Sequence, residues 1–81
     1  MNEKKIYTIL DRVSGLFQDP FVAVNDAVAV RMFKTWTAAP ELAPVAADLD
    51  LFLVGKINLH TGEVEGKDKP EFMYRLSDID G

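Results

Sequence analysis

With 81 residues, a formal net charge of −4 and no cysteine, the chain has the length of one domain and can form neither a disulfide bond nor a thiolate metal site. Hydrophobic residues make up 48% of it and charged residues 27%, which excludes the composition of a disordered chain. The negative net charge argues against a DNA-coating protein that depends on many phosphate contacts, although it is compatible with a local basic patch.

The N-terminal part of the chain predicts two strands separated by a turn. Residues 5–13 are rich in Ile, Tyr and Thr, and both faces of such a strand carry apolar side chains. We therefore expect this strand to lie inside a sheet or beneath a partner. Residues 14–15 (Ser-Gly) predict a turn and residues 19–20 (Asp-Pro) predict a break. Residues 21–24 then form a short second strand.

One helix is predicted in the middle of the chain. Asn25 is expected to cap its N-terminus, and the helix runs to residue 38 or 39 because Pro40 cannot continue it. Apolar side chains cover about half of its circumference, which is more than contact with one sheet face usually needs. Two interpretations stay open. The helix is either well buried in a small core, or its Val28 and Met32 reach a second subunit or another partner.

The strongest strand signal follows this helix. Residues 40–48 contain two prolines and are expected to be irregular. In residues 49–59 every second position is apolar apart from Gly55, so this face is expected to cover the helix and Gly55 to mark a bulge or a bend. A turn at residues 60–62 leads to a short strand at residues 63–65.

The C-terminal segment is predicted in less detail. Residues 66–70 form a charged turn, residues 71–76 fit either a strand or a helical turn, and the acidic tail at residues 76–81 is expected to be frayed. Together the elements predict a single α+β domain over residues 1–81, with an antiparallel sheet of about four strands packed on one α-helix in the order β-β-α-β-β. The expected core consists of Ile6, Leu10, Phe21, Ala29, Phe33, Trp36, Leu51, Leu53 and Ile57.

No membrane segment is expected. The longest apolar stretch, residues 51–55, is far too short to cross a bilayer, and the N-terminus lacks the unbroken apolar run of a signal peptide. We therefore expect a soluble intracellular protein.

Few residues could support catalysis. The single histidine, His60, lies in a predicted hairpin turn and has no second His or Cys with which to bind zinc. The acidic pairs Asp48 and Asp50, and Glu63 and Glu65, could hold Mg²⁺ or Ca²⁺, but we expect them to form solvated strand edges. The sequence thus predicts no catalytic residue, no metal site and no cofactor, and a protein that binds a partner rather than an enzyme.

Basic residues near aromatic ones are the candidates for nucleic-acid binding, because single-strand binders combine cationic grooves with stacking rings. Arg31 and Lys34 project from the opposite side of the helix to Trp36, so Trp36 is expected to lie in the core. The candidate nucleic-acid-binding residues are Lys4, Lys5, Tyr7, Arg12, Arg31 and Lys34. The candidate interface residues of a homo-oligomer, with a symmetric dimer favoured, are Val28, Met32, Tyr7 and Ile9.

Four segments together resemble the small non-structural protein of gokushoviruses, which are single-stranded-DNA bacteriophages of the microvirus group. They are KIYTILDRVSG at residues 5–15, PFVAVNDA at residues 20–27 with Arg31 and Phe33 after it, DLFLVG at residues 50–55, and TG at residues 61–62 followed by DKPEF at residues 68–72. Their order and spacing carry the resemblance, which extends over nearly the whole chain.

The resemblance implies an accessory protein of viral single-stranded DNA replication and genome packaging, often labelled DNA-binding, in the cytoplasm of the infected bacterial host. Its partners would be single-stranded DNA and viral replication or capsid-assembly proteins, and it brings no catalytic residues. The acidic balance of this chain departs from that of a simple DNA-binding protein. The alternative is a homo-oligomeric interaction module that engages a viral or host protein without touching DNA.

Overall fold

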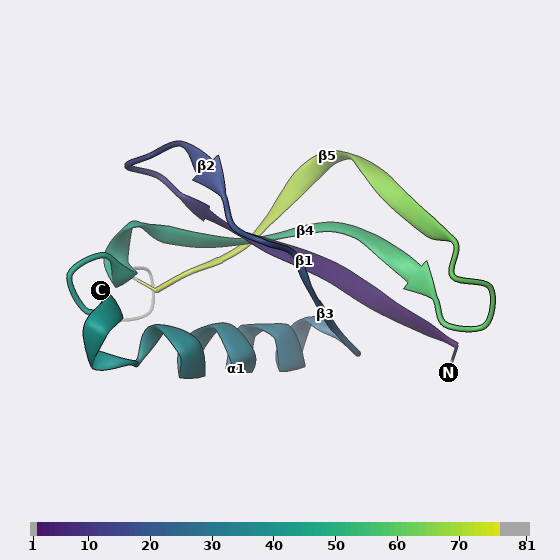
Figure 1. The fold of residues 1–81 in the computed structure, drawn as a ribbon, viewed down its shortest axis with the longest axis horizontal. Coiled ribbons are helices and arrows are strands. Elements are labelled where there is room, and N and C mark those ends of the chain that lie inside the picture. Colours follow the sequence, from purple (N-terminus) through teal and green to yellow (C-terminus); the bar gives the residue numbers. More distant parts are fainter. Residues whose placement is uncertain (1, 77–81) are drawn as a thin grey trace.

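A long, twisted antiparallel sheet with one helix against one of its faces makes up the fold (Figure 1). The structure is a computed structural model that describes residues 2–76. The elements are β1 (Glu3–Asp11), β2 (Leu16–Phe17), β3 (Phe21–Ala23), α1 (Asp26–Thr37), two short 3₁₀ helices (Pro40–Leu42 and Ala46–Asp48), β4 (Leu49–Asn58) and β5 (Val64–Arg75). The predicted α+β class is confirmed, but the predicted order β-β-α-β-β is wrong by one additional strand before the helix.

The additional strand arises because one edge of the sheet is built from two short pieces. β4 pairs with β1 along its whole length, and β2 and β3 both pair antiparallel with the other edge of β1. Between them the chain leaves the ladder at Pro20, which has no backbone N–H to donate. Two hydrogen bonds of 2.7 Å hold the break against β1, one from the Gln18 N–H to the Ile9 carbonyl and one from the Thr8 hydroxyl to the Gln18 carbonyl. We call β2 and β3 together the β2–β3 edge.

The helix begins and ends close to where the sequence predicts. The side chain of Asn25 accepts a hydrogen bond of 2.9 Å from the Val28 N–H, which satisfies one of the unpaired donors of the first turn. The last helical residue, Thr37, is buried and donates its hydroxyl to the Phe33 carbonyl at 2.7 Å. The predicted irregular segment after the helix consists of the two short 3₁₀ helices.

The core lies between α1 and the sheet. Among the described residues seven apolar side chains are buried, namely Tyr7, Ile9, Ala23, Ala29, Phe33, Leu49 and Leu51. The predicted core positions Ala29, Phe33 and Leu51 are therefore confirmed. Phe21 and Leu53 are partly buried against this cluster.

Four predicted core positions need correction. Tyr7 and Ile9 face the helix, so strand alternation turns Ile6 and Leu10 toward the opposite face, where both are partly exposed. Ile57 is partly exposed and lies outside the core cluster. Trp36 is 43% exposed, because the helix borders only the short, interrupted β2–β3 edge on that side.

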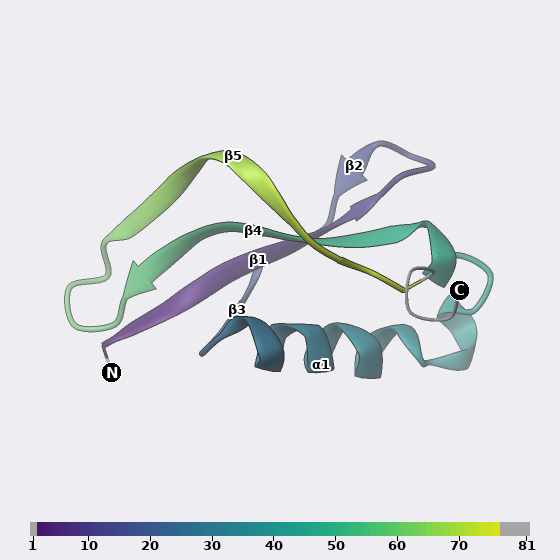
Figure 2. The same cartoon turned by 180° about the vertical axis from the view of Figure 1, so that it is seen from behind.

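Strand β5 corrects the predicted turn at residues 66–70. The chain keeps its direction there, and four residues, 67–70, stand opposite the single residue Val54 of β4. Figures 1 and 2 show the resulting arch, in which β5 rises away from β4 and returns to it. Residues 71–76 continue as strand up to Arg75, and Leu76 packs against the core. The rest of the predicted tail lies outside the described residues.

Gly55 lies where the backbone of β5 passes close to β4, and the predicted bulge or bend there is an irregularity in the strand pairing. The pairing of β4 with both neighbouring strands shifts between Leu53 and Gly55. A Cβ atom at Gly55 would stand 2.5 Å from the Glu65 carbonyl oxygen. Only glycine therefore fits this crossing of the two backbones.

Candidate nucleic-acid interface

The two faces of the sheet have different neighbours. One face packs on α1, and the other carries the residues that alternate with the buried ones. On β4, Leu49 and Leu51 point to the helix, so Asp50 and Phe52 point away from it. We call this second side of the sheet the open face.

Three phenylalanine rings lie side by side on the open face. Phe17 of β2 and Phe52 of β4 have ring centroids 5.5 Å apart, and Phe52 and Phe72 of β5 have centroids 5.9 Å apart. Both pairs are edge-to-face, a favourable arrangement of aromatic rings. Phe17 is 46% exposed and Phe72 is 47% exposed. We call these residues the phenylalanine row.

A buried carboxylate joins two arginines on the same face. Asp50, whose side chain is 3% exposed, accepts from Arg75 Nε at 2.8 Å and from Arg75 Nη2 at 2.9 Å, and Arg12 Nε lies 3.4 Å from it. The Arg12 guanidinium also donates to the Ala47 carbonyl. The Arg75 guanidinium lies 5.5 Å from the centre of the Phe72 ring. Among the described residues, two guanidinium groups and one carboxylate thus lie together beside the phenylalanine row.

This arrangement corrects the expectation of a solvated strand edge for Asp50. The register places Leu10, Asp50 and Arg75 next to one another across three strands. The arginines that cover the carboxylate come from the ends of β1 and β5, which the sequence does not show to be neighbours. The only indication of this buried ion pair in the sequence is that Asp50 stands between Leu49 and Leu51.

Tyr7 was expected both to bind nucleic acid and to line an interface, and the structure contradicts its availability for either. Its side chain is fully buried, and its hydroxyl donates to Asp26 Oδ1 at 2.5 Å, to which Lys5 Nζ also donates at 3.2 Å. Burial raises the pKa of Tyr7, and Asp26 raises it further through its hydrogen bond and its charge. The Tyr7 hydrogen bond lowers the pKa of Asp26, against the effect of burial, and Lys5 lowers it further. These groups fasten β1 to the start of α1.

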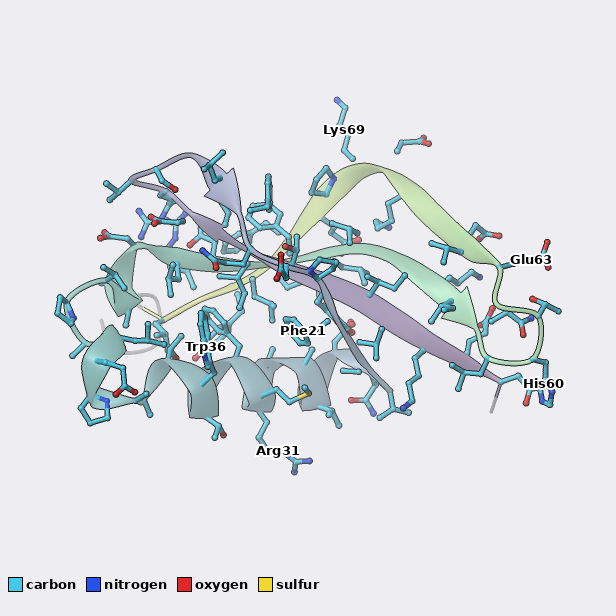
Figure 3. The ribbon with its side chains drawn as sticks, in the orientation of Figure 1. Phe21, Arg31, Trp36, His60, Glu63 and Lys69 are labelled. Atoms are coloured by element: carbon cyan, nitrogen blue, oxygen red, sulfur yellow. The ribbon has the colours of Figure 1, made fainter. Side chains whose placement is uncertain are left out.

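The remaining predicted nucleic-acid residues do not gather at one place. Arg12 lies at the open face beside Asp50, and the alternation of β1 places Lys4 on that face too, opposite Ile57. Lys34 lies 5.6 Å from the centre of the Tyr74 ring, on the helix side of the sheet. Figure 3 shows Arg31 pointing away from the sheet altogether.

Sequence reasoning did not select Lys69, which rises from the arch on the far side of the sheet from α1 (Figure 3). Lys69 lies three residues before Phe72 in the chain. The sequence predicts a turn at residues 66–70, and this prediction gives no indication that Lys69 lies above the sheet.

The acidic pairs and the histidine are not gathered into a larger cluster of metal-binding side chains. Within residues 2–76 no group of three or more His, Cys, Asp or Glu side chains could hold a metal ion. His60 and Glu63 lie at the hairpin end of the sheet (Figure 3), and His60 Nε2 is 2.8 Å from Asn2 Oδ1. No helix in this part of the chain is long and apolar enough to cross a membrane.

An apolar groove of about 390 Å³ runs between α1 and the β2–β3 edge. Phe21, Met32 and Trp36 line it together with Ile9 and Asp19, and Figure 3 shows Phe21 and Trp36 between the helix and the sheet. Met32 is 41% exposed, whereas Ile9 is buried. We call this feature the helix groove.

Of the predicted interface residues, Met32 and Ile9 therefore line the helix groove. Ile9 lies at its base, as a buried member of the core. Val28 is partly buried and packs against the core from the helix.

These features define a small α+β protein with one helix on a curled antiparallel sheet and an aromatic open face. The chain belongs to the Phage ORF5 protein family, whose model matches residues 4–79. It is therefore a phage-encoded protein, as the resemblance to a small phage protein predicted. No curated protein and no solved structure matches the chain.

Proposed function

We propose that this phage protein binds single-stranded DNA on the open face, without a catalytic step. In this proposal it serves viral single-stranded DNA replication and packaging in the cytoplasm of the infected bacterium. The resemblance to the gokushovirus protein supports that setting. The observation that carries the proposal is the phenylalanine row with guanidinium groups at its end.

Stacking is the physical basis of the proposed binding. Single-strand binders place unpaired bases on aromatic side chains of a sheet or groove, and each stacked base contributes about 1–3 kcal/mol. The phenylalanine row extends over β2, β4 and β5, and two of its three rings are nearly half exposed. The row therefore offers apolar ring surface along a path that crosses the strands.

Charge contributes less than stacking at this site. The cationic groups beside the row are Arg12 and Arg75, which share the carboxylate of Asp50. Lys69 rises from the arch on the same side of the sheet. The chain as a whole is acidic. Since each neutralised phosphate of a single strand contributes about −0.7 to the slope of log K against log salt, we expect a shallow slope of about −1 to −2.

Fluorescence anisotropy with a labelled oligothymidylate at low salt tests the proposal. Phe17→Ala and Phe72→Ala should each weaken binding by about 5- to 150-fold, as expected from the loss of one stacked base. Leu16→Ala is the matched control, because Leu16 is the exposed neighbour of Phe17 on β2. The absence of binding by the wild-type protein at low salt would refute the proposal.

A second result would refute it as well. If the phenylalanine variants changed the sedimentation of the protein but bound DNA as the control does, the row would be a contact between proteins. That result would support the alternative function, a protein–protein module that engages a viral replication or capsid-assembly protein, or a host protein. The eleven large hydrophobic side chains that are exposed among residues 2–76 favour this alternative.

A further inference from the structure

The molecule exposes many large apolar side chains for the size of its core. Seven apolar residues are buried, while eleven large hydrophobic side chains of residues 2–76 are exposed. A domain of this size without disulfides gains stability when association buries further apolar area. Two of the exposed side chains, Met32 and Trp36, lie one helical turn apart and line the helix groove.

We propose that the helix groove is the contact between two copies of this chain, related by a two-fold axis. Met32 and Trp36 of each copy pack against the groove of the other. In such a contact the same patch must supply both the projecting and the receiving groups. Met32 and Trp36 are each about two-fifths exposed on the helix. Phe21 lines the same groove and would pack against these two side chains of the other copy.

Charges of both signs lie near the groove, at Asp19 and Arg31, although of the two only Asp19 belongs to its lining. Asp19 lines the groove from the β2–β3 edge, and Arg31 precedes Met32 on the helix and points away from its own sheet (Figure 3). The ion pairs found among residues 2–76 include neither of them. A two-fold contact between the helices brings Arg31 of one copy to the Asp19 side of the other, twice in each dimer.

The required area is within reach of this surface. A stable interface buries about 800 Å² on each partner, which is about a seventh of the 5413 Å² surface of the chain. The exposed side of a twelve-residue helix together with the β2–β3 edge supplies a continuous patch for it. Because α1 lies opposite the open face, the two phenylalanine rows of the dimer point outward in this arrangement.

Trp36 is the single tryptophan of the chain, so its fluorescence reports directly on the proposed contact. On raising the concentration from about 1 µM to about 100 µM, the emission should shift to the blue as the indole leaves water. Sedimentation over the same range should approach twice the 9.0 kDa mass of one chain. Met32→Glu should keep the protein monomeric and its emission red-shifted, with unchanged circular dichroism.

Reversal of the charges at Asp19 and Arg31 tests whether a second copy of this chain occupies the groove. Asp19→Arg and Arg31→Asp should each raise the dissociation constant about tenfold or more, because each places like charges together. The double variant should restore dimerisation. Lys69→Asp is the control for Arg31→Asp, since it makes the same charge change at an exposed lysine of the arch, outside the groove lining.

The proposal is overturned if the wild-type protein sediments as a monomer at the highest concentration without a shift in emission. It is also overturned if Met32→Glu remains dimeric, or if the double charge variant stays monomeric. None of these readouts involves DNA, so they are independent of the proposed function of the open face.

Discussion

Asp50 connects two arginines from distant parts of the chain, Arg12 near the end of β1 and Arg75 at the end of β5. Its carboxylate is buried, while each arginine side chain is about one-third exposed, at 36% and 34%. Removing a buried partner leaves charges without compensation, which costs more than the intact pair contributes. Partial exposure of the guanidinium groups reduces that cost, because water can solvate them.

Asp50→Asn should therefore lower the free energy of unfolding by about 2 kcal/mol in urea denaturation. Asp68→Asn, at an exposed carboxylate of the arch, should change it by less than about 0.5 kcal/mol. If the two substitutions lowered the free energy of unfolding equally, the ion pairs of Asp50 would not stabilise the fold. Because the substitution removes the negative charge that compensates an arginine beside the phenylalanine row, the same variant should bind DNA more tightly at low salt.

The Tyr7–Asp26 pair predicts how stability depends on pH. The folded pKa of Asp26 is lowered, so its contribution is present above the ordinary value of about 4 and is lost as the pH falls through the folded value. The folded pKa of Tyr7 is raised, so its contribution is present below about pH 10 and is lost as the pH rises through the folded value.

Tyr7→Phe removes the largest cause of the lowered Asp26 pKa and removes the phenol itself. The variant should lose less stability than the wild type both below about pH 4 and above about pH 10. Urea midpoints measured across the pH range would check this. Parallel curves for the two proteins would contradict the proposed linkage.

At the scale of elements, strand β5 depends on one glycine of its neighbour β4. Gly55 and Gly66 are cross-strand partners, but their surroundings differ. A Cβ at Gly55 meets the Glu65 carbonyl oxygen at 2.5 Å, whereas a Cβ at Gly66 has its nearest neighbour at 3.9 Å. Alanine substitutions at these two positions therefore separate the effect of the close backbone contact from the general effect of replacing a glycine.

Gly55→Ala should destabilise the protein by about 1–3 kcal/mol, because the two strands must separate to admit the methyl group. Gly66→Ala should be close to neutral or slightly stabilising, since it fits without strain and restricts the unfolded chain. Thermal unfolding of both variants would decide. A Gly66→Ala variant as unstable as Gly55→Ala would show that the arch, and not the close approach, sets the cost.

Local signals predicted the elements better than their pairing. Asn25 marked the helix start and Gly15, at φ +77°, a turn, because capping and left-handed backbone depend on neighbouring residues alone. The split β2–β3 edge and the arch depend on register between distant segments, which alternation along one strand does not encode. Ile6 and Tyr7 were assigned to the wrong faces for that reason.

The same limit explains what was missed at the open face. Alternation placed Phe52 away from the helix, as observed. Phe17 and Phe72 lie on β2 and β5, and only pairing of these strands with β1 and β4 brings the rings together. A contact between side chains of three strands leaves no mark on the alternation of apolar and polar residues along any one strand, so the sequence pattern does not reveal it.

At the scale of the whole molecule, the helix supports only part of the sheet. The protein is 40 Å long and 22 Å wide, and the sheet extends beyond the start of α1 toward the hairpin between β4 and β5 (Figure 1). All seven buried apolar residues belong to the segments that meet at the helix. The outlying end therefore lacks a core of its own.

Amide hydrogen exchange should reveal this division. Residues 7–9 and 49–51 should exchange most slowly, and residues 3–5 and 64–66 should exchange faster, because opening the outlying end exposes little apolar surface. Uniform protection along β1 would contradict this expectation.

Both outer edges of the sheet are interrupted at a proline, Pro20 between β2 and β3 and Pro70 in the arch of β5. An incoming strand would find no continuous series of donors and acceptors on either side. The two interruptions therefore disfavour edge-to-edge pairing of one molecule with another through backbone hydrogen bonds. Any contact between molecules would then depend on side chains of the sheet faces and the helix, and not on strand addition at an edge.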